Sequence, residues 1–435
     1  MKVVYKDDFT AILCGDCKDL KYSKGVDAVV TDPPYGLSFM GKDWDYGIPG
    51  VGYWTSIKDA MKPGAHLLAF GGTRTHHRLM VAIEDAGFEI RDTLMWVYGS
   101  GFPKSHNIGK AVDKKLGNRR EDLGTEERWI QPSNSMGGGV DKERGERTIT
   151  KGNTEWEGWG TALKPAWEPI ILARKPLSEK SVADNVLKHS TGGINIDGCR
   201  VVLSEGDDPR LGGKGAWKTD KMAKDVYEGG YSGDDIASSE LGRFPANFIH
   251  DGTEEVVELF PNSKGWSNQK HNSFNPYGGN ALHSSETERD GFHEGYNDEG
   301  SASRFFYCAK GQPYSYAGKE YEKSKENSLF KQGDKPQAPS NYNDEGSPAR
   351  FFYCAKTPKK ERGEGNTHPT VKPQALMRYL CRLITPPDGV ILDPFMGSGS
   401  TLLASRSEGF KSIGIDINSE YCDIAVNRWN NEWNT

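Results

Sequence analysis

The chain has 435 residues, 27 % of them charged, with a formal net charge of −6 and a mean hydropathy of −0.70. This length allows two or three domains or one core with large insertions, and the 52 glycines and only 35 % hydrophobic residues favour the insertions. The net negative charge excludes a surface that is basic throughout, so any site for a polyanion must be a local basic patch.

The first part of the chain, residues 1–100, alternates strand-like with helix-like patterns. The expected strands cover residues 10–13, 26–30, 65–70 and 93–97. The expected helices cover 54–61 and 75–86, followed by Gly64 and Gly87 where C-terminal caps would stand. Strands that alternate with helices predict a parallel sheet covered by helices on both faces.

The middle of the chain, residues 101–365, is rich in Gly, Ser, Asn, Asp and Lys and has only scattered strand-like runs, such as 169–173. It is either a domain of loops and small strands or partly disordered until it binds. One segment, 296–310, recurs at 342–356, each copy containing Arg-Phe-Phe-Tyr-Cys-Ala-Lys. We interpret this as a local duplication and prefer a buried strand pair to a basic-aromatic binding segment.

The last part returns to regular structure, with helices expected over 371–384, 398–408 and from 418, and strands over 390–394 and 411–415. The final helix is followed by no strand, whereas the chain opens with the strand at 10–13. If both ends belong to one sheet, the first strand completes what the last segment leaves open. The fold would then be circularly permuted.

Cysteine usage and hydropathy indicate a cytoplasmic protein. The seven cysteines lack disulfide-scaffold spacing, so we interpret them as thiols. Cys14 and Cys17 form a Cys-x-x-Cys pair that no second ligand pair complements, and we expect no metal site. Residues 1–10 contain no apolar signal core, and no apolar run is long enough to cross a bilayer.

The strongest chemical signal is Asp32-Pro33-Pro34-Tyr35, directly after the strand at 26–30 and so at the ligand-binding edge of an open sheet. The amine of a nucleobase is a poor nucleophile because its lone pair is delocalised into the ring. The Asp32 carboxylate and the Pro33 carbonyl could accept its two protons and favour attack on a sulfonium methyl. Tyr35 offers a face for an extruded base. The structural alternative is a Pro-Pro turn that closes the strand.

A second signal is the glycine-rich run 392–401, placed between a strand and a helix, where glycines allow a ligand to approach the backbone. Leu402 stands where a dinucleotide fingerprint has its third glycine. Asp416 ends the next strand, where it could accept the hydroxyls of a ribose. The pattern suits a nucleoside cofactor without a pyrophosphate.

The order of these motifs resembles the beta-group amino-methyltransferases of DNA, in which the catalytic motif precedes the cofactor motif. Residues 368–373, His-Pro-Thr-Val-Lys-Pro, are similar to that group's additional cofactor segment, and 414–421 to its ribose-binding strand. Segments 99–106, 164–169 and 192–197 resemble phage and prophage DNA methylases. The departure is the duplication, since those relatives carry one copy just before the His-Pro-Thr motif.

The resemblance implies a circularly permuted class I S-adenosylmethionine-dependent methyltransferase, an α/β fold with a seven-stranded sheet and a large loop-rich insertion for target recognition. Its cofactor would be S-adenosylmethionine and its partner double-stranded DNA, with the target base flipped and no covalent intermediate. The catalytic residues would be Asp32, Pro33, Pro34 and Tyr35. The cofactor-binding residues would be Asp16, Thr370, Lys372, Asp393, Phe395, Gly397, Ser398, Gly399, Ser400 and Asp416, with Thr370 and Lys372 on the methionine carboxylate. A surface charge is the alternative for Lys372, and a turn residue for Asp16.

The resemblance also implies a division into a catalytic half over 1–176, with an insert at about 100–165, a target-recognition region over 177–364 and a cofactor-binding half over 365–435. Basic residues that could contact phosphate, rather than form solvated faces, fall into two groups. They are Lys104, Lys110, Lys114, Lys115, Arg119 and Arg120, and then Lys356, Lys359, Lys360 and Arg362.

Adenine N6 is the favoured target, because enzymes that methylate cytosine at N4 more often have Ser in place of Asp32. Cytosine N4 remains the alternative. Methylation at cytosine C5 needs a Cys nucleophile, usually after Pro, and the chain contains no Pro-Cys. A rival from another class is a nucleic-acid-binding protein that has lost catalysis. The recognition sequence, a homodimer and a partner nuclease are left open.

Overall fold

The computed structural model describes residues 1–22, 25–37, 47–99, 105–130, 143–201, 243–260, 262–263, 300–308, 359–363, 365–368 and 370–433. Most of them surround one sheet of ten strands. From edge to edge these are β1 (Lys2–Lys6), β2 (Thr10–Cys14), β14 (Lys411–Asp416), β13 (Val390–Asp393), β3 (Val26–Thr31), β4 (Met61–Phe70), β8 (Trp167–Arg174), β5 (Glu89–Val97), β9 (Phe248–His250) and β12 (Tyr307–Cys308).

The two ends of the chain share this sheet. β2 pairs in parallel with β14, with Thr10 opposite Ser412 and their hydroxyl oxygens 2.9 Å apart. β13 pairs in parallel with both β14 and β3, so the strands at the end of the chain stand between strands from its beginning. The permuted arrangement predicted from the sequence is therefore confirmed.

The seven central strands, from β2 to β5, run in parallel except for β8, which is antiparallel to both β4 and β5. This order with one reversed strand matches the class I methyltransferase sheet that the resemblance implies. The expected seven strands are extended to ten, because β1 adds an antiparallel edge and β9 and β12 continue beyond β5. The loop-rich middle of the chain thus contributes strands to the main sheet.

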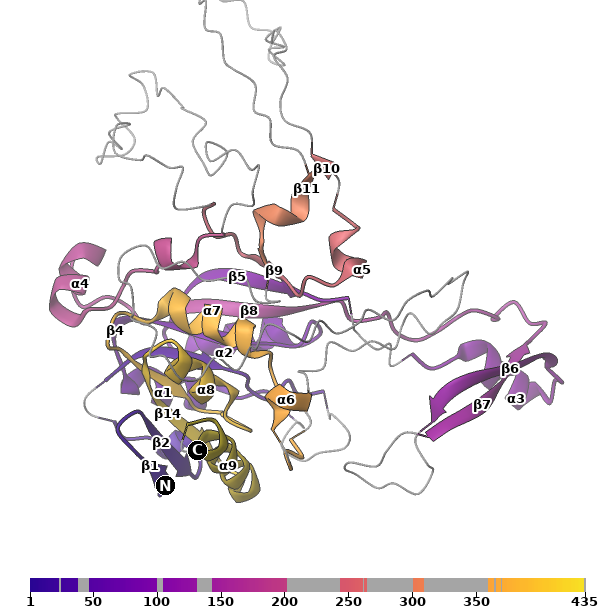
Figure 1. The fold of residues 1–435 in the computed structure, drawn as a ribbon, viewed down its shortest axis with the longest axis horizontal. Coiled ribbons are helices and arrows are strands. Elements are labelled where there is room, and N and C mark those ends of the chain that lie inside the picture. The colour runs from indigo at the N-terminus through magenta and orange to yellow at the C-terminus, as the bar shows by residue number, and fades with distance from the viewer. Residues whose placement is uncertain are drawn as a thin grey trace, which may run out of the picture.

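Helices cover both faces of the sheet, as predicted (Figure 1). Strand residues alternate between two apolar clusters: Val29 packs with α1 (Val51–Ala60) and α2 (His76–Asp85), whereas Val30 packs with α7 (Gln374–Ile384). A third cluster joins α8 (Ser400–Ser407) and α9 (Ser419–Trp433) to β2. Near the chain ends, Trp429 Nε1 donates a hydrogen bond of 2.8 Å to Asp7. Among the described helices none is long and apolar enough to cross a membrane.

Two predicted boundaries are wrong. The helix expected over 371–384 begins at Gln374, because Pro373 has extended backbone angles (φ −61°, ψ 135°) and forces the residue before it to be extended as well. Gly64 caps no helix: α1 ends at Ala60, and Gly64 lies inside β4 with φ of +79°. Gly87 follows α2 with φ of +88°, as expected for a C-terminal cap.

A module outside the sheet consists of α3 (Ile108–Leu116) and the antiparallel hairpin of β6 (Glu121–Ile130) and β7 (Glu143–Lys151). It lies well away from the sheet, at the right of Figure 1. Its centre is polar, because Arg120 bonds to the buried carboxylate of Asp113 and, at 2.7 Å, to Glu157. We call these three residues the Arg120 cluster.

The remaining described elements of the middle region are short. They are α4 (Val182–His189), the 3-10 turn η4 (Asp197–Cys199), α5 (Glu254–Val257), β10 (Asn262–Ser263), β11 (Gly300–Ser301), the 3-10 turn η7 (Ala302–Phe305) and α6 (Lys359–Arg362). In the first copy of the duplication, Tyr307 of β12 stacks on Tyr379 of α7, with ring centroids 3.8 Å apart. The second copy lies outside the described residues.

Candidate active site

The carboxyl ends of the parallel strands bring the predicted motifs to one edge of the sheet. Asp32 follows β3, the glycine-rich turn 394–399 follows β13, and Asp416 ends β14. Because β13 lies between β3 and β14, the three motifs are neighbours. A hydrogen bond of 2.6 Å from Thr31 Oγ1 to Asp393 Oδ1 joins the first two. Site residues predicted from both ends of the chain are thus brought together.

The glycine-rich turn is tightly enclosed. Gly397 and Gly399 have φ of +51° and +80°, in the left-handed region that favours glycine. A Cβ atom on Gly397 would lie 2.7 Å from Nε2 of His368, so backbone and imidazole are in close contact. The Gly397 N–H donates a hydrogen bond of 2.9 Å to Oδ2 of Asp416. These contacts fix the turn against the end of β14 while leaving a side-chain-free backbone.

A buried arginine supports the same turn, and the sequence analysis missed it. Arg428 of α9, only 5 % exposed, donates to the carbonyl oxygen of Ser398 at 2.6 Å and to the hydroxyls of Ser398 and Ser400. It also donates to the Glu361 carbonyl at 2.7 Å. Burial lowers its pKa to about 10, which still leaves it charged at neutral pH. The hydroxyls of Ser398 and Ser400 therefore take part in hydrogen bonds within the turn.

The two predicted cofactor carboxylates differ in environment. Asp393 is 3 % exposed and accepts hydrogen bonds from Thr31, from Thr401 at 2.5 Å and from the Phe395 N–H at 3.2 Å. Burial raises its pKa to about 7 against the opposing effect of these bonds. Asp416 is only half-buried, and burial raises its pKa to about 6. Asp393 thus links the strands, whereas Asp416 keeps lone pairs for a further donor.

The outer part of the turn carries an aromatic group. Phe395 contacts Tyr53 and Trp54 of α1, with ring centroids 6.1 Å away in both cases. Asp16, two residues beyond β2, accepts a hydrogen bond of 3.0 Å from the Lys18 N–H and caps the 3-10 turn η1 (Cys17–Asp19). Asp16 thus has the turn role, and its place among the cofactor-binding residues stays a prediction.

The tetrapeptide 32–35 belongs to a cluster of charged and polar side chains from three parts of the chain. We call Asp32, Tyr35, Glu168 and Lys372 the Asp32 cluster. Lys372 Nζ lies 2.7 Å from Oδ2 of Asp32 and 3.3 Å from Oε2 of Glu168. The Tyr35 hydroxyl lies 2.8 Å from Oδ1 of Asp32 and 2.9 Å from Oε2 of Glu168. One ammonium and one hydroxyl proton thus serve two carboxylates.

The surroundings of this cluster keep Lys372 charged. Burial opposes the charge of its ammonium, but Asp32 and Glu168 outweigh burial and raise its pKa. The Lys372 side chain is 10 % exposed, and its ammonium also lies 4.7 Å from the centre of the Phe70 ring. Burial raises the pKa of Tyr35 well above its usual range, and the two carboxylates add to this effect. Tyr35 therefore remains a neutral hydroxyl at any physiological pH.

Two sequence expectations change here. Lys372 was expected with Thr370 near a methionine carboxylate, or on the surface; it is buried, so the surface interpretation is wrong, and its ammonium contacts Asp32. The Thr370 carbonyl oxygen lies 2.7 Å from Nδ1 of His368. Glu168 was noted only within a resembling segment and was given no role. Its signal was present: an acidic residue stands second in a strand whose following residues, 169–173, are all apolar.

The described members of the two predicted basic groups differ in exposure and in their contacts. Lys114, Lys115 and Arg119 are exposed at the end of α3, but Arg120 is taken up by the Arg120 cluster. Arg362 donates to the His368 carbonyl at 2.8 Å. Lys104 and Lys356 lie outside the described residues.

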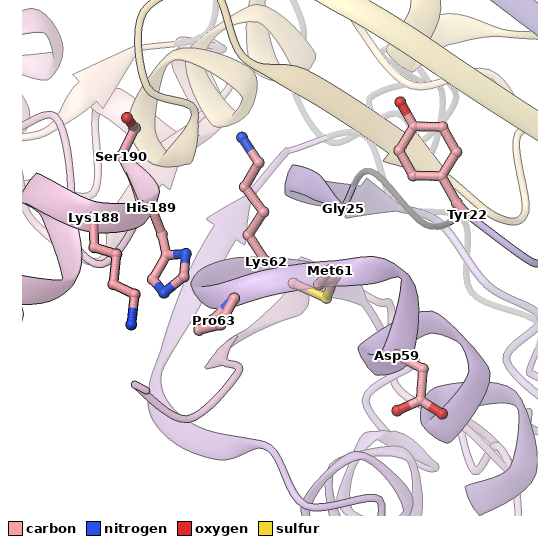
Figure 2. Close-up of a pocket in the computed structure, with 9 residues that line it drawn as sticks. All are labelled: Tyr22, Gly25, Asp59, Met61, Lys62, Pro63, Lys188, His189 and Ser190. Carbon is pink, nitrogen blue, oxygen red and sulfur yellow. The ribbon is translucent and has the colours of Figure 1, made fainter. Parts of the chain in front are cut away.

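A polar cavity of about 450 Å³ lies elsewhere, at the amino ends of β3 and β4 (Figure 2). Its lining is Tyr22, Gly25, Asp59, Met61, Lys62, Pro63, Lys188, His189 and Ser190. Lys62 is paired there with Asp27 at 2.5 Å, and Lys188 with Glu179. Ligands of open α/β sheets bind at the opposite, carboxyl edge. No predicted site residue contributes to this cavity. Among the described residues, no group of three His, Cys, Asp or Glu could hold a metal.

The chain is similar to known proteins over parts of its length. Residues 236–427, which contain the glycine-rich turn, Lys372 and Asp416, match the family described as DNA methylase. Over these residues the chain is similar to that family, as the resemblance to the beta group of DNA amino-methyltransferases implies. The type II methyltransferase M.ScaI of Streptomyces caespitosus is 46 % identical over 70 residues, which cover 16 % of this chain and 23 % of that protein. The DNA adenine methyltransferase YhdJ of Escherichia coli K12 is 42 % identical over 65 residues, covering 15 % and 22 %.

The chain thus spans about a quarter of the length of those curated relatives. Among solved structures, the M1.HpyAVI–SAM complex is similar at 13 % identity, covering 97 % of this chain and 100 % of that one, with a TM-score of 0.34. The assignment of the fold rests on the strand order of the sheet itself.

Proposed function

We propose that this protein transfers a methyl group from S-adenosylmethionine to the exocyclic N6 amine of adenine in DNA. The observation that carries the proposal is the junction of Asp32, after β3, with the glycine-rich turn after β13 through the Thr31–Asp393 hydrogen bond. A hydrogen-bond acceptor for an amine and a cradle for a nucleoside thereby stand side by side at the sheet edge.

The residues of the cradle fit S-adenosylmethionine. The backbone of Gly397 and Gly399 carries no side chain that would block close approach, Phe395 offers an aromatic surface, and the half-buried Asp416 offers acceptors for ribose hydroxyls. When bound, the cofactor supplies a sulfonium methyl group, an electrophile that protein side chains lack. Asp393 and Arg428 have their polar atoms engaged within the protein and act by holding the turn.

Asp32 and Pro33 would orient the substrate. The Asp32 oxygens accept bonds from Lys372 and Tyr35, yet a carboxylate has about four acceptor positions, which leaves room for an amine N–H. The Pro33 carbonyl would accept the second N–H. Both acceptors shift the lone pair of the amine back onto nitrogen, which makes it a better nucleophile. Because Lys372 stays charged beside it, Asp32 is held in one orientation.

Adenine is favoured over cytosine by Asp32 itself, since Ser is more frequent at this position in enzymes for cytosine N4. YhdJ, which shares 42 % identity over 65 residues, is described as an adenine methyltransferase. The target base would be flipped out of the duplex, because its amine is otherwise inaccessible. Residues 177–364 would recognise the target sequence, and the exposed Lys114, Lys115 and Arg119 would contact phosphate. The reaction would take place in the cytoplasm of a bacterial or phage-infected cell.

The test is transfer of a tritiated methyl group from S-adenosylmethionine to unmethylated plasmid DNA, followed by hydrolysis and separation of the modified bases. Label in N6-methyladenine supports the proposal. Label in N4-methylcytosine would retain the enzyme class and overturn the choice of base. Cofactor binding without any transfer to DNA of varied sequence would overturn the enzymatic proposal in favour of a nucleic-acid-binding protein.

A further inference from the structure

The Asp32 cluster contains a continuous hydrogen-bonded path between two carboxylates. Oδ1 of Asp32 and Oε2 of Glu168 lie 2.8 and 2.9 Å from the same Tyr35 hydroxyl. A hydroxyl has one proton and two lone pairs, so it can receive a proton from one side while it donates its own to the other. This arrangement exceeds what stacking of a base requires, because the ring alone supplies the stacking surface.

Methylation of an amine requires such a path. The amine nitrogen forms a bond to the methyl carbon, the carbon–sulfur bond breaks with its electron pair staying on sulfur, and one N–H proton must leave. Asp32 is the group placed to receive that proton first. The Asp32 side chain is 22 % exposed, as is that of Glu168, and a substrate base bound against Asp32 would cover it on that side.

The charge of Lys372 gives the path a direction. Its ammonium lies 2.7 Å from Asp32 but 3.3 Å from Glu168. A nearby positive charge favours the ionised form of a carboxylate, and more strongly at shorter distance. A proton shared between the two carboxylates is therefore more stable on Glu168. One added proton also leaves the cluster neutral, since two carboxylates then share one ammonium and one proton.

We propose that Glu168 is the terminal acceptor of the proton that leaves the substrate amine, and that it receives this proton through the Tyr35 hydroxyl. This rests on the proposed methyl transfer. As Asp32 passes the proton to the Tyr35 oxygen, the Tyr35 proton moves to Oε2 of Glu168, and Asp32 returns to its ionised state. The Glu168 side chain is 22 % exposed, so it can release the proton to solvent afterwards.

The experiment measures single-turnover methyl transfer from tritiated S-adenosylmethionine to unmethylated plasmid DNA across pH 6 to 10. Tyr35→Phe keeps the ring and removes the hydroxyl, and Glu168→Gln keeps the shape and removes the proton acceptor. Each is expected to lower the rate at pH 7 by about 100-fold, with cofactor affinity changed by less than about threefold. The variant rates should rise with pH, because hydroxide then removes the proton from Asp32. Formate should partly restore Glu168→Ala.

The matched control is Glu89→Gln, which removes an ion pair to Arg174 at the far end of β8 and should leave the rate unchanged. Wild-type rate and pH profile in Tyr35→Phe would overturn the relay. So would a loss in both variants that neither high pH nor formate reverses, because a purely structural role behaves in that way. Absence of transfer by the wild-type chain would instead overturn the proposed function.

Discussion

The Asp32 cluster and the Arg120 cluster are both networks of buried charge, but they depend on different supports. The first joins β3, β8 and the segment before α7 on top of a sheet whose strands are almost wholly buried. The second lies in a module whose described large apolar side chains are largely exposed, among them Leu116 at 66 % and Leu123 at 53 %. The Asp32 cluster can be specialised for chemistry because the packed sheet holds it in place. The Arg120 cluster must itself hold its module together.

The largest effect should come from Asp32→Ala. Loss of the acceptor is expected to lower methyl transfer by about 10²–10⁴-fold. The fold should persist, because Lys372 keeps Glu168 as a partner at 3.3 Å and the sheet beneath is unchanged. Single-turnover methylation and cofactor binding by calorimetry measure the two effects. Transfer at the wild-type rate would show that the tetrapeptide is only a turn.

Arg120→Met should affect the fold rather than the chemistry. It leaves the carboxylate of Asp113, 1 % exposed, without its ion pair, and a buried charge that has lost its partner destabilises the structure around it. The module of α3, β6 and β7 should open while the sheet stays folded. Hydrogen exchange is expected to lose protection in these elements and to keep it in β3 and β13. Equal loss in both regions would mean that the module and the sheet unfold as one unit.

Arg428→Met tests whether the glycine-rich turn at the edge of the sheet depends on this arginine. The variant leaves the carbonyls of Ser398 and Glu361 without this donor, at about 1–3 kcal/mol for each buried group. We expect a lower melting temperature and weaker S-adenosylmethionine binding, because the glycine-rich turn loses its support. Arg406→Met, which changes an arginine near the surface ring of Phe9, is the matched control. Unaltered cofactor affinity in Arg428→Met would show that the turn is held without it.

The raised pKa of Asp393 predicts a smaller effect, in which the stability of the fold depends on pH. Its pKa is about 7 in the folded chain and 3.8 is its ordinary value, so the folded state binds this proton more tightly. The stabilising contribution is complete below about pH 4 and is lost as pH rises through 7. The wild type should therefore lose stability relative to Asp393→Asn between these values. Urea unfolding of both proteins at pH 4.5 and pH 8 measures this change in relative stability. A stability difference that is the same at both pH values would contradict the raised pKa of Asp393.

The sequence could predict the sheet and its motifs because hydrophobic runs, glycines and prolines act locally. Glycines that closely follow a strand, such as Gly397 and Gly399, predict a turn. Asp32-Pro33-Pro34-Tyr35 predicts the turn after another strand in the same way. The prediction that both chain ends share one sheet followed from the strand expected at 10–13, which could complete the sheet that the last segment leaves open. The start of α7 was missed because Pro373 limits the residues before it, a local effect that helical periodicity hides.

The roles of Arg428 and Glu168 could not be predicted from the sequence, because their hydrogen-bonding partners are far away along the chain. Arg428 reads as one of several polar residues of an amphipathic helix, and only the packing of α9 turns it toward Ser398. Lys372 likewise has its partner, Asp32, at the other end of the chain. Side-chain contacts over such separations depend on the sheet order.

The position of β13 and β14 between β2 and β3 also has a consequence for biosynthesis. On the ribosome, β2 and β3 emerge long before β13 and β14, which stand between them in the sheet and begin at Val390 and Lys411. At about 5–20 residues per second, this interval is on the order of tens of seconds. During it, both strands expose the edges that β13 and β14 later cover, so the nascent chain must be kept from pairing with others. The same strand order that brings the site residues together thus leaves these two edges uncovered until β13 and β14 have been made.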